Sequence, residues 1–306
     1  MRRYRFYQLD VFTAQPFGGN PLAVFVDAEG LSDAEMQSIA KEMNLSETTF
    51  VLPPADPQAD VRVRIFTPGF ELPLAGHPVV GTHWLLAELG RYRLAEPTTR
   101  VWGQLGVGTL PVDLSVAEGR VTRVTMTQAK PQFMAEVDDV APLAAALGLS
   151  VADMTVPNLK PQVVSTGAVQ LMAPVTSLEA MGRIRVNTQA LETVLAGLGT
   201  FLVMPFTFET VSPSASVHTR AFPVGMGIPE DAATGSATGG LGAYLVQHAA
   251  LPRNGAVTRF VTEQGLEMGR PSTLYVEVEG TPGAVETVRV GGTAVTVIEA
   301  ELRLPG

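Results

Sequence analysis

Ala75-Gly76-His77-Pro78-Val79-Val80-Gly81-Thr82 returns in altered form as Thr234-Gly235-Ser236-Ala237-Thr238-Gly239-Gly240-Leu241. Both stretches have glycine at the same two places, and each runs into a long apolar segment. Each also follows a strand-like run and a turn rich in proline and glycine. This repeat predicts two similar halves, each with a buried helix that begins at a turn. Unpaired backbone N–H groups at two such helix starts would offer a binding place for a small anion.

Short alternating or β-branched runs occupy much of the remaining chain and predict strands. In the first half they lie at 4–12, 22–26, 48–52, 61–66, 99–103, 109–115 and 121–127; in the second half they lie at 162–165, 168–172, 201–206, 217–223, 256–262, 273–279, 285–290 and 294–300. Helices are expected after the capping box that starts at Ser32, and at 78–89, 142–147, 188–197 and 237–248.

The helices at 78–89 and 237–248 are apolar on nearly all sides, which is typical of a helix buried on all sides. We therefore predict an α/β (α+β) fold of two pseudo-symmetric domains, each a mostly antiparallel sheet wrapped around a central apolar helix. The expected domains are 1–128 and 129–306. The pattern leaves open whether the last strand crosses back to complete the first domain.

Composition excludes several classes of protein. A chain of 306 residues, 46% hydrophobic and 17% charged, can fill the cores of two ordinary domains. The net charge is −9 without a basic stripe, so nucleic acid is not an expected partner. No apolar run approaches the roughly 20 residues of a membrane-spanning helix, and the first residues do not resemble a signal peptide. We expect a cytoplasmic protein with no membrane partner.

The chain has no cysteine, which rules out disulfides, thiolate metal sites and a cysteine nucleophile. Its four histidines show no zinc-type spacing, so a catalytic metal is not expected. Acid–base chemistry must then come from other side chains. Of the histidines, His83 is expected in the core or at its edge, while His218 and His248 show no constellation.

Glu47 stands at the start of an apolar strand. If its side chain points inward, desolvation favours the protonated form, which suits a group that takes and returns a proton. The alternative is a solvated glutamate in a turn. His77 lies at the start of a buried helix, where positive charge is disfavoured, so a neutral imidazole could bind a carboxylate or carbonyl group. The alternative is a turn histidine bonded to the backbone.

Glu230 and Asp231 precede the second glycine-rich stretch, where acids are commonly turn or cap residues. The functional alternative is that Asp231 pairs with an amine or orients the acid–base group. Ser236 is a natural N-cap for the helix that follows, or it holds a carboxylate together with nearby N–H groups. A phosphate site is not favoured, because the chain lacks a Gly-Lys-Ser/Thr run.

Four motifs in order carry a resemblance to a known family. They are Asp10-Val11-Phe12-Thr13 with Pro16-Phe17-Gly18-Gly19-Asn20-Pro21, Asn44-Leu45-Ser46-Glu47-Thr48-Thr49-Phe50, Arg64-Ile65-Phe66-Thr67-Pro68 with Glu71-Leu72-Pro73-Leu74-Ala75-Gly76-His77-Pro78, and Glu230-Asp231-Ala232-Ala233-Thr234-Gly235-Ser236-Ala237. On these motifs the chain resembles the PhzF family of phenazine-biosynthesis-like isomerases. The resemblance implies a diaminopimelate-epimerase-like fold, an active site between two similar domains, a homodimer, and no cofactor.

The resemblance also assigns roles to residues. It implies that Glu47 is the acid–base catalyst and that Asp231 and His77 complete the catalytic set. Substrate binding would fall to Ser46, Gly76, Gly235 and Ser236. The characterised family reaction isomerises a dihydro-hydroxyanthranilate by moving a proton along a conjugated system.

Epimerases of this fold use two thiols, and Ala75 and Thr234 stand about where those thiols would be. A two-thiol mechanism is therefore impossible in this chain. The favoured hypothesis is that the chain is a cofactor-independent isomerase of a small carboxylated substrate. A lyase using the same site, a non-catalytic protein that binds a small anion, and a structural dimer component remain as alternatives.

Overall fold

The computed structural model describes residues 1–252 and 255–305. The chain packs into two compact units. Unit 1 comprises residues 1–126 together with the C-terminal segment from residue 291, and unit 2 comprises residues 127–290. The two units are described in turn.

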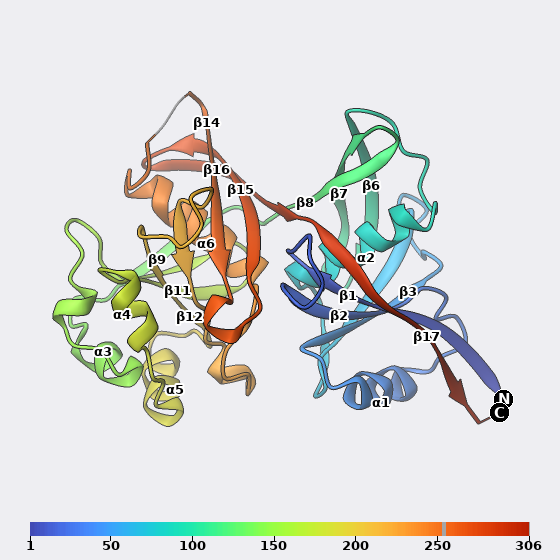
Figure 1. The fold of residues 1–306 in the computed structure, drawn as a ribbon, viewed down its shortest axis with the longest axis horizontal. Helices are drawn as coiled ribbons and strands as arrows, with labels where there is room; N and C mark the ends of the chain where they lie inside the picture. The colour runs from blue at the N-terminus through green and yellow to red at the C-terminus, as the bar shows by residue number, and fades with distance from the viewer. Residues whose placement is uncertain (253–254, 306) are drawn as a thin grey trace. The chain divides into compact units, whose positions relative to one another are not determined.

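Unit 1 contains nine strands and two helices in the described part of the chain. The strands are β1 (Arg2–Val11), β2 (Asn20–Phe25), β3 (Glu47–Leu52), β4 (Val61–Phe66), β5 (Glu71–Leu72), β6 (Thr98–Leu105), β7 (Gly108–Ala117), β8 (Arg120–Thr127) and β17 (Ala294–Leu304); the helices are α1 (Asp33–Met43) and α2 (Gly76–Glu88). The last strand pairs antiparallel with β1 along its length, so the two chain ends lie side by side (Figure 1). This pairing answers what the pattern left open about the last strand.

Unit 2 repeats this content with extra helices. Its strands are β9 (Gln132–Glu136), β10 (Gln162–Ser165), β11 (Val169–Pro174), β12 (Val203–Thr207), β13 (Val217–Thr219), β14 (Val257–Gln264), β15 (Ser272–Thr281) and β16 (Ala284–Gly292). Its helices are α3 (Ala141–Leu147), α4 (Leu178–Arg183), α5 (Thr188–Gly197) and α6 (Gly235–Gln247), with short 3₁₀ turns η1 (Ala152–Met154), η2 (Val224–Met226) and η3 (Leu266–Met268).

The two units share one order of strand pairing. In unit 1, β1–β2 is antiparallel, β2–β3 parallel, β3–β4 antiparallel and β4–β6 parallel. In unit 2, β10–β11, β11–β12, β12–β13 and β13–β14 follow the same sequence of orientations. In each unit the central helix lies in the chain just before the last strand of this series. The predicted fold class, with two pseudo-symmetric, mostly antiparallel sheets, is confirmed.

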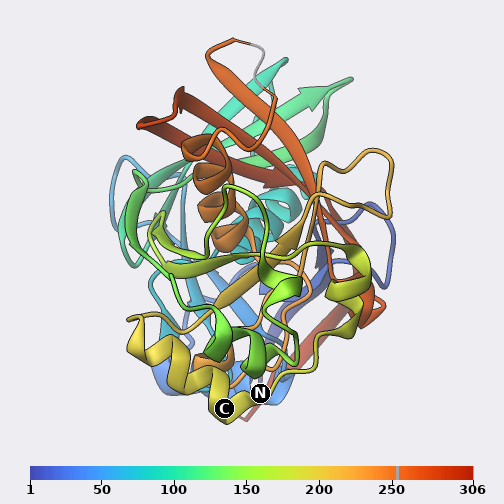
Figure 2. The same ribbon diagram turned by 90° about the vertical axis from the view of Figure 1, so that its left-hand side faces the viewer.

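Each sheet wraps around one helix, as the apolar patterns predict. Helix α2 packs against β1, β2, β3 and β17, and α6 packs against β10, β11 and β15 (Figures 1 and 2). Glycines make these contacts close. A Cβ on Gly81 would lie 2.6 Å from the Val11 side chain of β1, and a Cβ on Gly242 would lie 2.8 Å from the Val276 side chain of β15. Larger residues at these two positions would push the sheet away from its helix.

Helices α3, α4 and α5 cover the outer face of the unit 2 sheet (Figure 2). Side chains alternate between the two faces of β10 and β11. Val163 and Leu171 therefore join the core beneath these helices. Gln162 and Gln170, their neighbours in the chain, bond instead to His248 and Ser236 at the two ends of α6.

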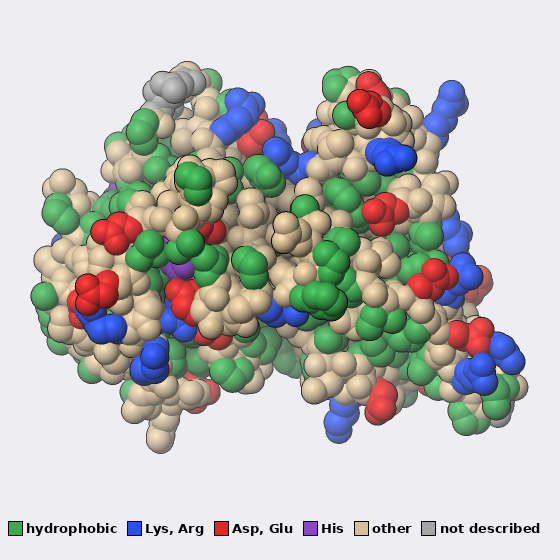
Figure 3. Space-filling model, in the orientation of Figure 1, with side chains coloured by type: hydrophobic (Ala, Val, Ile, Leu, Met, Phe, Trp, Pro, Cys, Tyr) green, Lys and Arg blue, Asp and Glu red, His purple; other side chains and the backbone are tan. Residues whose placement is uncertain are grey.

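A few elements differ from the sequence-based expectations. Strands β5 and β9 and helix α4 lie in segments for which no element was expected. The strand expected at 217–223 ends at Thr219, because Ala221 and Phe222 form only isolated bridges. Within the described residues, no helix is long and apolar enough to cross a membrane. On the face drawn in Figure 3, the basic side chains lie scattered among acidic ones.

Candidate active site

Glu47 is placed by the end of one helix and the start of a strand. The capping box of Ser32 and Glu35 starts α1, and Asn44 ends it in the left-handed conformation, with φ of 50°. The chain then turns and enters β3 at Glu47, which stands opposite Leu22 of the parallel strand β2. Only 8% of Glu47 is exposed, so the carboxyl group is inside the unit and the solvated-turn alternative is wrong.

The side chain of Glu47 points toward α2. Residues two apart on a strand share a face, and Thr49 on that same face meets Thr82 of α2 with 2.9 Å between the hydroxyl oxygens. Glu47 meets His77, the second residue of α2, with 3.3 Å between Oε2 and Nε2. The contact follows from strand alternation and from the packing of α2 against β3.

His77 is buried at 5% exposure, and burial lowers its pKa to about 3. A buried imidazole at a helix N-terminus disfavours the positive charge. The neutral form expected from the sequence is therefore supported, although burial is the cause. Near pH 7 the Glu47 carboxyl thus faces a neutral ring, which offers either a hydrogen-bond donor or an acceptor according to its tautomer.

The start of α2 presents backbone donors. Its N-cap residue, Ala75, makes no side-chain capping bond. The first helical N–H groups belong to Gly76 and His77, while Pro78 has none. The N–H of Val79 is the first to bond within the helix, to the carbonyl of Ala75 at 3.4 Å. Two donors beside Glu47 and His77 can therefore receive a carboxylate group.

In unit 2 the two adjacent acids have separate partners. Glu230 binds the guanidinium of the buried Arg220 through two bonds of 2.8 Å, which makes it a structural residue. The carboxylate of Asp231 accepts a hydrogen bond of 2.5 Å from the hydroxyl of Thr234. The backbone N–H of Asp231 donates to the carbonyl of Ala221 at 3.0 Å. Glu230 thus stabilises the fold, and Asp231 is fixed beside the start of α6.

The prediction that Ser236 caps α6 is wrong. The N-cap is Thr234, and Ser236 is the second residue of the helix, because the chain is already helical at Gly235. The Ser236 hydroxyl lies 3.0 Å from the side-chain amide of Gln170 on β11. It is half-buried, and it remains a candidate for substrate binding. Ser46 and Gly76 are half-buried in unit 1, beside Glu47 and His77 in the chain, whereas Gly235 is buried.

Comparison with known proteins places the chain in a family. The model of the family described as "Phenazine biosynthesis-like protein" (PhzC-PhzF) matches residues 9–300. The chain belongs to the PhzC-PhzF family.

Individual relatives in this family agree along the whole chain. The chain is 35% identical over 306 residues to an uncharacterized isomerase from Clostridium acetobutylicum, with 99% of each chain covered. It is 35% identical over 304 residues to trans-2,3-dihydro-3-hydroxyanthranilate isomerase from Pseudomonas aeruginosa, covering 98% of this chain and 100% of that one. A PhzF-family crystal structure from Bacillus anthracis superposes with a TM-score of 0.90 at 32% identity, covering 99% and 100% of the two chains. The predictions of a PhzF-like fold and of an isomerase are confirmed.

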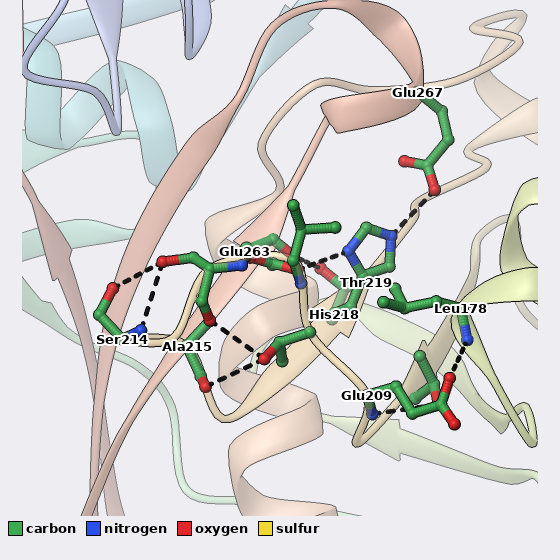
Figure 4. Close-up of polar contacts among 12 residues, drawn as sticks. Leu178, Glu209, Ser214, Ala215, His218, Thr219, Glu263 and Glu267 are labelled. Atoms are coloured by element: carbon green, nitrogen blue, oxygen red, sulfur yellow. Dashed lines mark hydrogen bonds and ion pairs between the residues drawn. The ribbon is translucent and has the colours of Figure 1, made fainter.

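One buried cluster, of a histidine with two glutamates, was not predicted from the sequence. His218 was expected to have no constellation, and this is wrong: its Nδ1 lies 2.9 Å from Glu263 and its Nε2 lies 2.9 Å from Glu267 (Figure 4). Glu263 also accepts the backbone N–H groups of Val211 and Ser212. Burial alone would lower the pKa of His218, but the bonds and charges of the two carboxylates raise it above its usual value.

The other histidines have local roles. His83 is in the core, as expected, and its Nδ1 lies 2.8 Å from the hydroxyl of Tyr92. His248 lies 2.8 Å from the amide oxygen of Gln162. Among the described residues, no group of three or more histidine and acidic side chains is arranged to hold a metal ion. Glu47 with His77 is, by contrast, a buried carboxyl group that faces a histidine whose pKa burial lowers.

Proposed function

We propose that this chain is a cofactor-independent isomerase that moves a proton on a small carboxylated substrate, with Glu47 as the acid–base group. The observation that carries the proposal is the buried Glu47 carboxyl, 3.3 Å from a histidine that burial keeps neutral. A charged partner would stabilise the carboxylate and make it a poor base. A neutral partner leaves Glu47 able both to take a proton and to return it.

The other proposed residues bind and orient. The two N–H groups at the start of α2, from Gly76 and His77, suit the substrate carboxylate, with Ser46 close by in the chain. His77 supplies a hydrogen bond to a substrate carbonyl. In unit 2 we propose Asp231, Gly235 and Ser236 as substrate-binding residues, with Asp231 receiving a hydrogen-bond donor such as an amine.

The relative from Pseudomonas aeruginosa gives the first compound to test. Its name specifies trans-2,3-dihydro-3-hydroxyanthranilate, a cyclic carboxylate that carries an amine and a hydroxyl group. We propose a substrate of this class: a small cyclic carboxylate that also carries a hydrogen-bond donor and an acidic C–H. A homodimer is also proposed, and sedimentation equilibrium of the purified protein tests it.

The test is turnover of this compound, and of a panel of small amino-bearing carboxylates, in deuterated water. An isomerase gives a product of unchanged composition with deuterium at one carbon. A product that has lost a group would instead favour the lyase, and thermal stabilisation without turnover would favour a binding protein.

Glu47→Gln keeps the shape of the side chain and removes its titrating group. We expect kcat to fall by about 10²- to 10⁴-fold, the usual contribution of a general acid–base residue. Glu42→Gln is the matched control, because Glu42 is exposed on α1. Full activity of Glu47→Gln would refute the proposed role.

A further inference from the structure

The carboxylate of Asp231 ends a chain of three hydrogen-bonded side chains inside unit 2. Gln264, the last residue of β14, is fully buried. Its Nε2 lies 3.0 Å from the hydroxyl oxygen of Thr234, and that oxygen lies 2.5 Å from Oδ2 of Asp231. Neither Gln264 nor this connection is evident in the sequence, because Gln264 lies 30 positions beyond Thr234.

The direction of each bond is fixed by its partners. Gln264 Nε2 also donates to the backbone carbonyl of Asp231 at 2.8 Å, and Gln264 Oε1 accepts the backbone N–H of Thr234 at 3.2 Å. Turning the amide over would therefore set oxygen against oxygen and nitrogen against N–H. Because the Thr234 oxygen accepts from Gln264, its own proton points to the Asp231 carboxylate.

The backbone around these residues is held closely. Gly265 follows Gln264 with φ of +78°, and a Cβ there would lie 2.5 Å from the carbonyl oxygen of Ala232. The hydroxyl of Ser272 donates to that same carbonyl at 2.9 Å. The segment from Asp231 to Thr234 is thus seated against the end of β14 and the start of β15.

We propose that Thr234 and Gln264 are positioning residues. The two hydrogen bonds from Gln264 to Thr234 and from Thr234 to Asp231, called the relay below, hold the Asp231 carboxylate in the orientation that receives the substrate. The proposal rests on the role of Asp231 in the proposed function. Thr234 then donates a hydrogen bond to the Asp231 carboxylate and takes no part in the chemistry itself. A hydrogen bond to a charged group is worth enough for its loss to change binding or rate by about 10- to 100-fold.

The kinetic test uses two pairs of variants with trans-2,3-dihydro-3-hydroxyanthranilate. Thr234→Val keeps the shape and removes the hydroxyl, whereas Thr234→Ser keeps the hydroxyl. We expect kcat/KM to fall about 10- to 100-fold in the first and to stay within about threefold in the second. Gln264→Glu replaces the donor by an acceptor and turns the Thr234 proton away from Asp231, so it should match Thr234→Val, and the double variant should be no worse.

Thr262→Val is the control, because Thr262 is buried on the same strand and its hydroxyl has no hydrogen-bond partner within the described structure. It should leave kcat/KM unchanged. Equal activity of Thr234→Val and wild type, with an unchanged Tm, would overturn the relay.

A measurement without substrate separates this inference from the proposed function. Thr234→Val should lower Tm by about 2–4 °C, the shift that roughly 1 kcal/mol gives in a protein of this size. Gln264→Glu should lower Tm further, because it also buries a carboxylate against the carbonyl oxygen of Asp231. The double variant should lose no more than Gln264→Glu alone, because both substitutions break the same relay. Additive losses would refute the relay even if wild type turns the compound over. Non-additive losses in a protein that turns over none of the panel would uphold the relay and refute the proposed function.

Discussion

Among the described residues, two buried histidines contact glutamate side chains, and the pKa values of the two imidazoles shift in opposite directions. In unit 1, His77 meets one carboxyl group at 3.3 Å, and burial lowers the pKa of the imidazole to about 3. In unit 2, His218 lies between Glu263 and Glu267 at 2.9 Å from each, and its pKa is raised. Burial acts on both rings, so the number and alignment of the carboxylates decide the outcome.

The difference distinguishes the proposed catalytic contact of Glu47 with His77 from the structural contact of His218 with Glu263 and Glu267, called the clamp below. The imidazole of His218 contacts both carboxylates, and Glu263 also ties the segment at Val211 and Ser212 to β14 (Figure 4). Burial alone would raise the pKa of Glu267, but its bond to His218 and the charge of that imidazole lower it. His77 offers Glu47 no such charge, because burial lowers the pKa of its imidazole to about 3.

The largest effect should come from removing one carboxylate of each contact in turn. Glu47→Gln should lower kcat by about 10²- to 10⁴-fold. Glu267→Gln keeps a hydrogen-bond acceptor for His218 and should leave kcat within about threefold, since an effect confined to stability does not enter the rate constant. Steady-state kinetics of both variants decide the matter, and equal losses would show that the two contacts are not different in kind.

The free energy of unfolding should depend strongly on the contact of His218 in unit 2. Glu263→Ala removes the acceptor of His218 and of two backbone N–H groups, and breaking a buried charge pair in this way costs about 3–5 kcal/mol. The exposed Glu286 on β16 offers the same substitution without such contacts. Urea unfolding should show a large loss for Glu263→Ala and almost none for Glu286→Ala. A small loss for Glu263→Ala would mean that the clamp is not structural.

The pH dependence of stability should differ in sign between the two histidines. His77 is protonated only in the unfolded chain between about pH 6.5 and pH 3, so the free energy of unfolding falls on acidification by about 1.4 kcal/mol per pH unit for this one group. His83, whose pKa burial lowers to about 4, adds to the same slope. His218 stabilises the fold below about pH 6.5, and this contribution disappears as the pH rises through its raised pKa.

Variants assign these slopes. His77→Gln should flatten the acid side of the stability curve, and His218→Gln should flatten the side above neutrality. Urea unfolding between pH 4 and pH 9 measures both. A steeper acid slope in His77→Gln would contradict the neutral imidazole.

The smallest effect concerns the face that carries Glu47. Thr49→Val removes the hydroxyl that meets Thr82 on α2 and leaves Thr82 without this partner. A loss of about 1 kcal/mol in stability is expected, with kcat little changed. Thermal unfolding and kinetics check this, and a large fall in kcat would mean that Thr49 helps to place Glu47.

Much of the fold could be predicted because its signals are local. The glycine spacing and the apolar runs at 78–89 and 237–248 indicated two buried helices, and the capping box placed α1. Glu47 could be identified from the sequence for the same reason, since a charged residue at the start of an apolar strand is a local anomaly. The strand expected at 217–223 was too long, because the tertiary bonds of Arg220 and Ala221 end the ladder at Thr219.

What could not be predicted depends on long-range pairing. His218 and its two acids lie 45 and 49 positions apart in the chain, and parallel pairing of β13 with β14 brings them together. Gln264 reaches Thr234 through the same strand. The prediction that Ser236 is the N-cap was wrong because the helix begins one residue earlier, at Gly235. The preference of serine for the N-cap position does not show where a helix begins.

The central claim is that His77 is neutral beside Glu47 while His218 is charged between its two acids. Nitrogen-15 NMR of the imidazoles at pH 7 tests it directly, with His77→Gln and His218→Gln to assign the signals. We expect one protonated ring nitrogen in His77 and two in His218. An imidazolium at His77, or a neutral ring at His218, would contradict it.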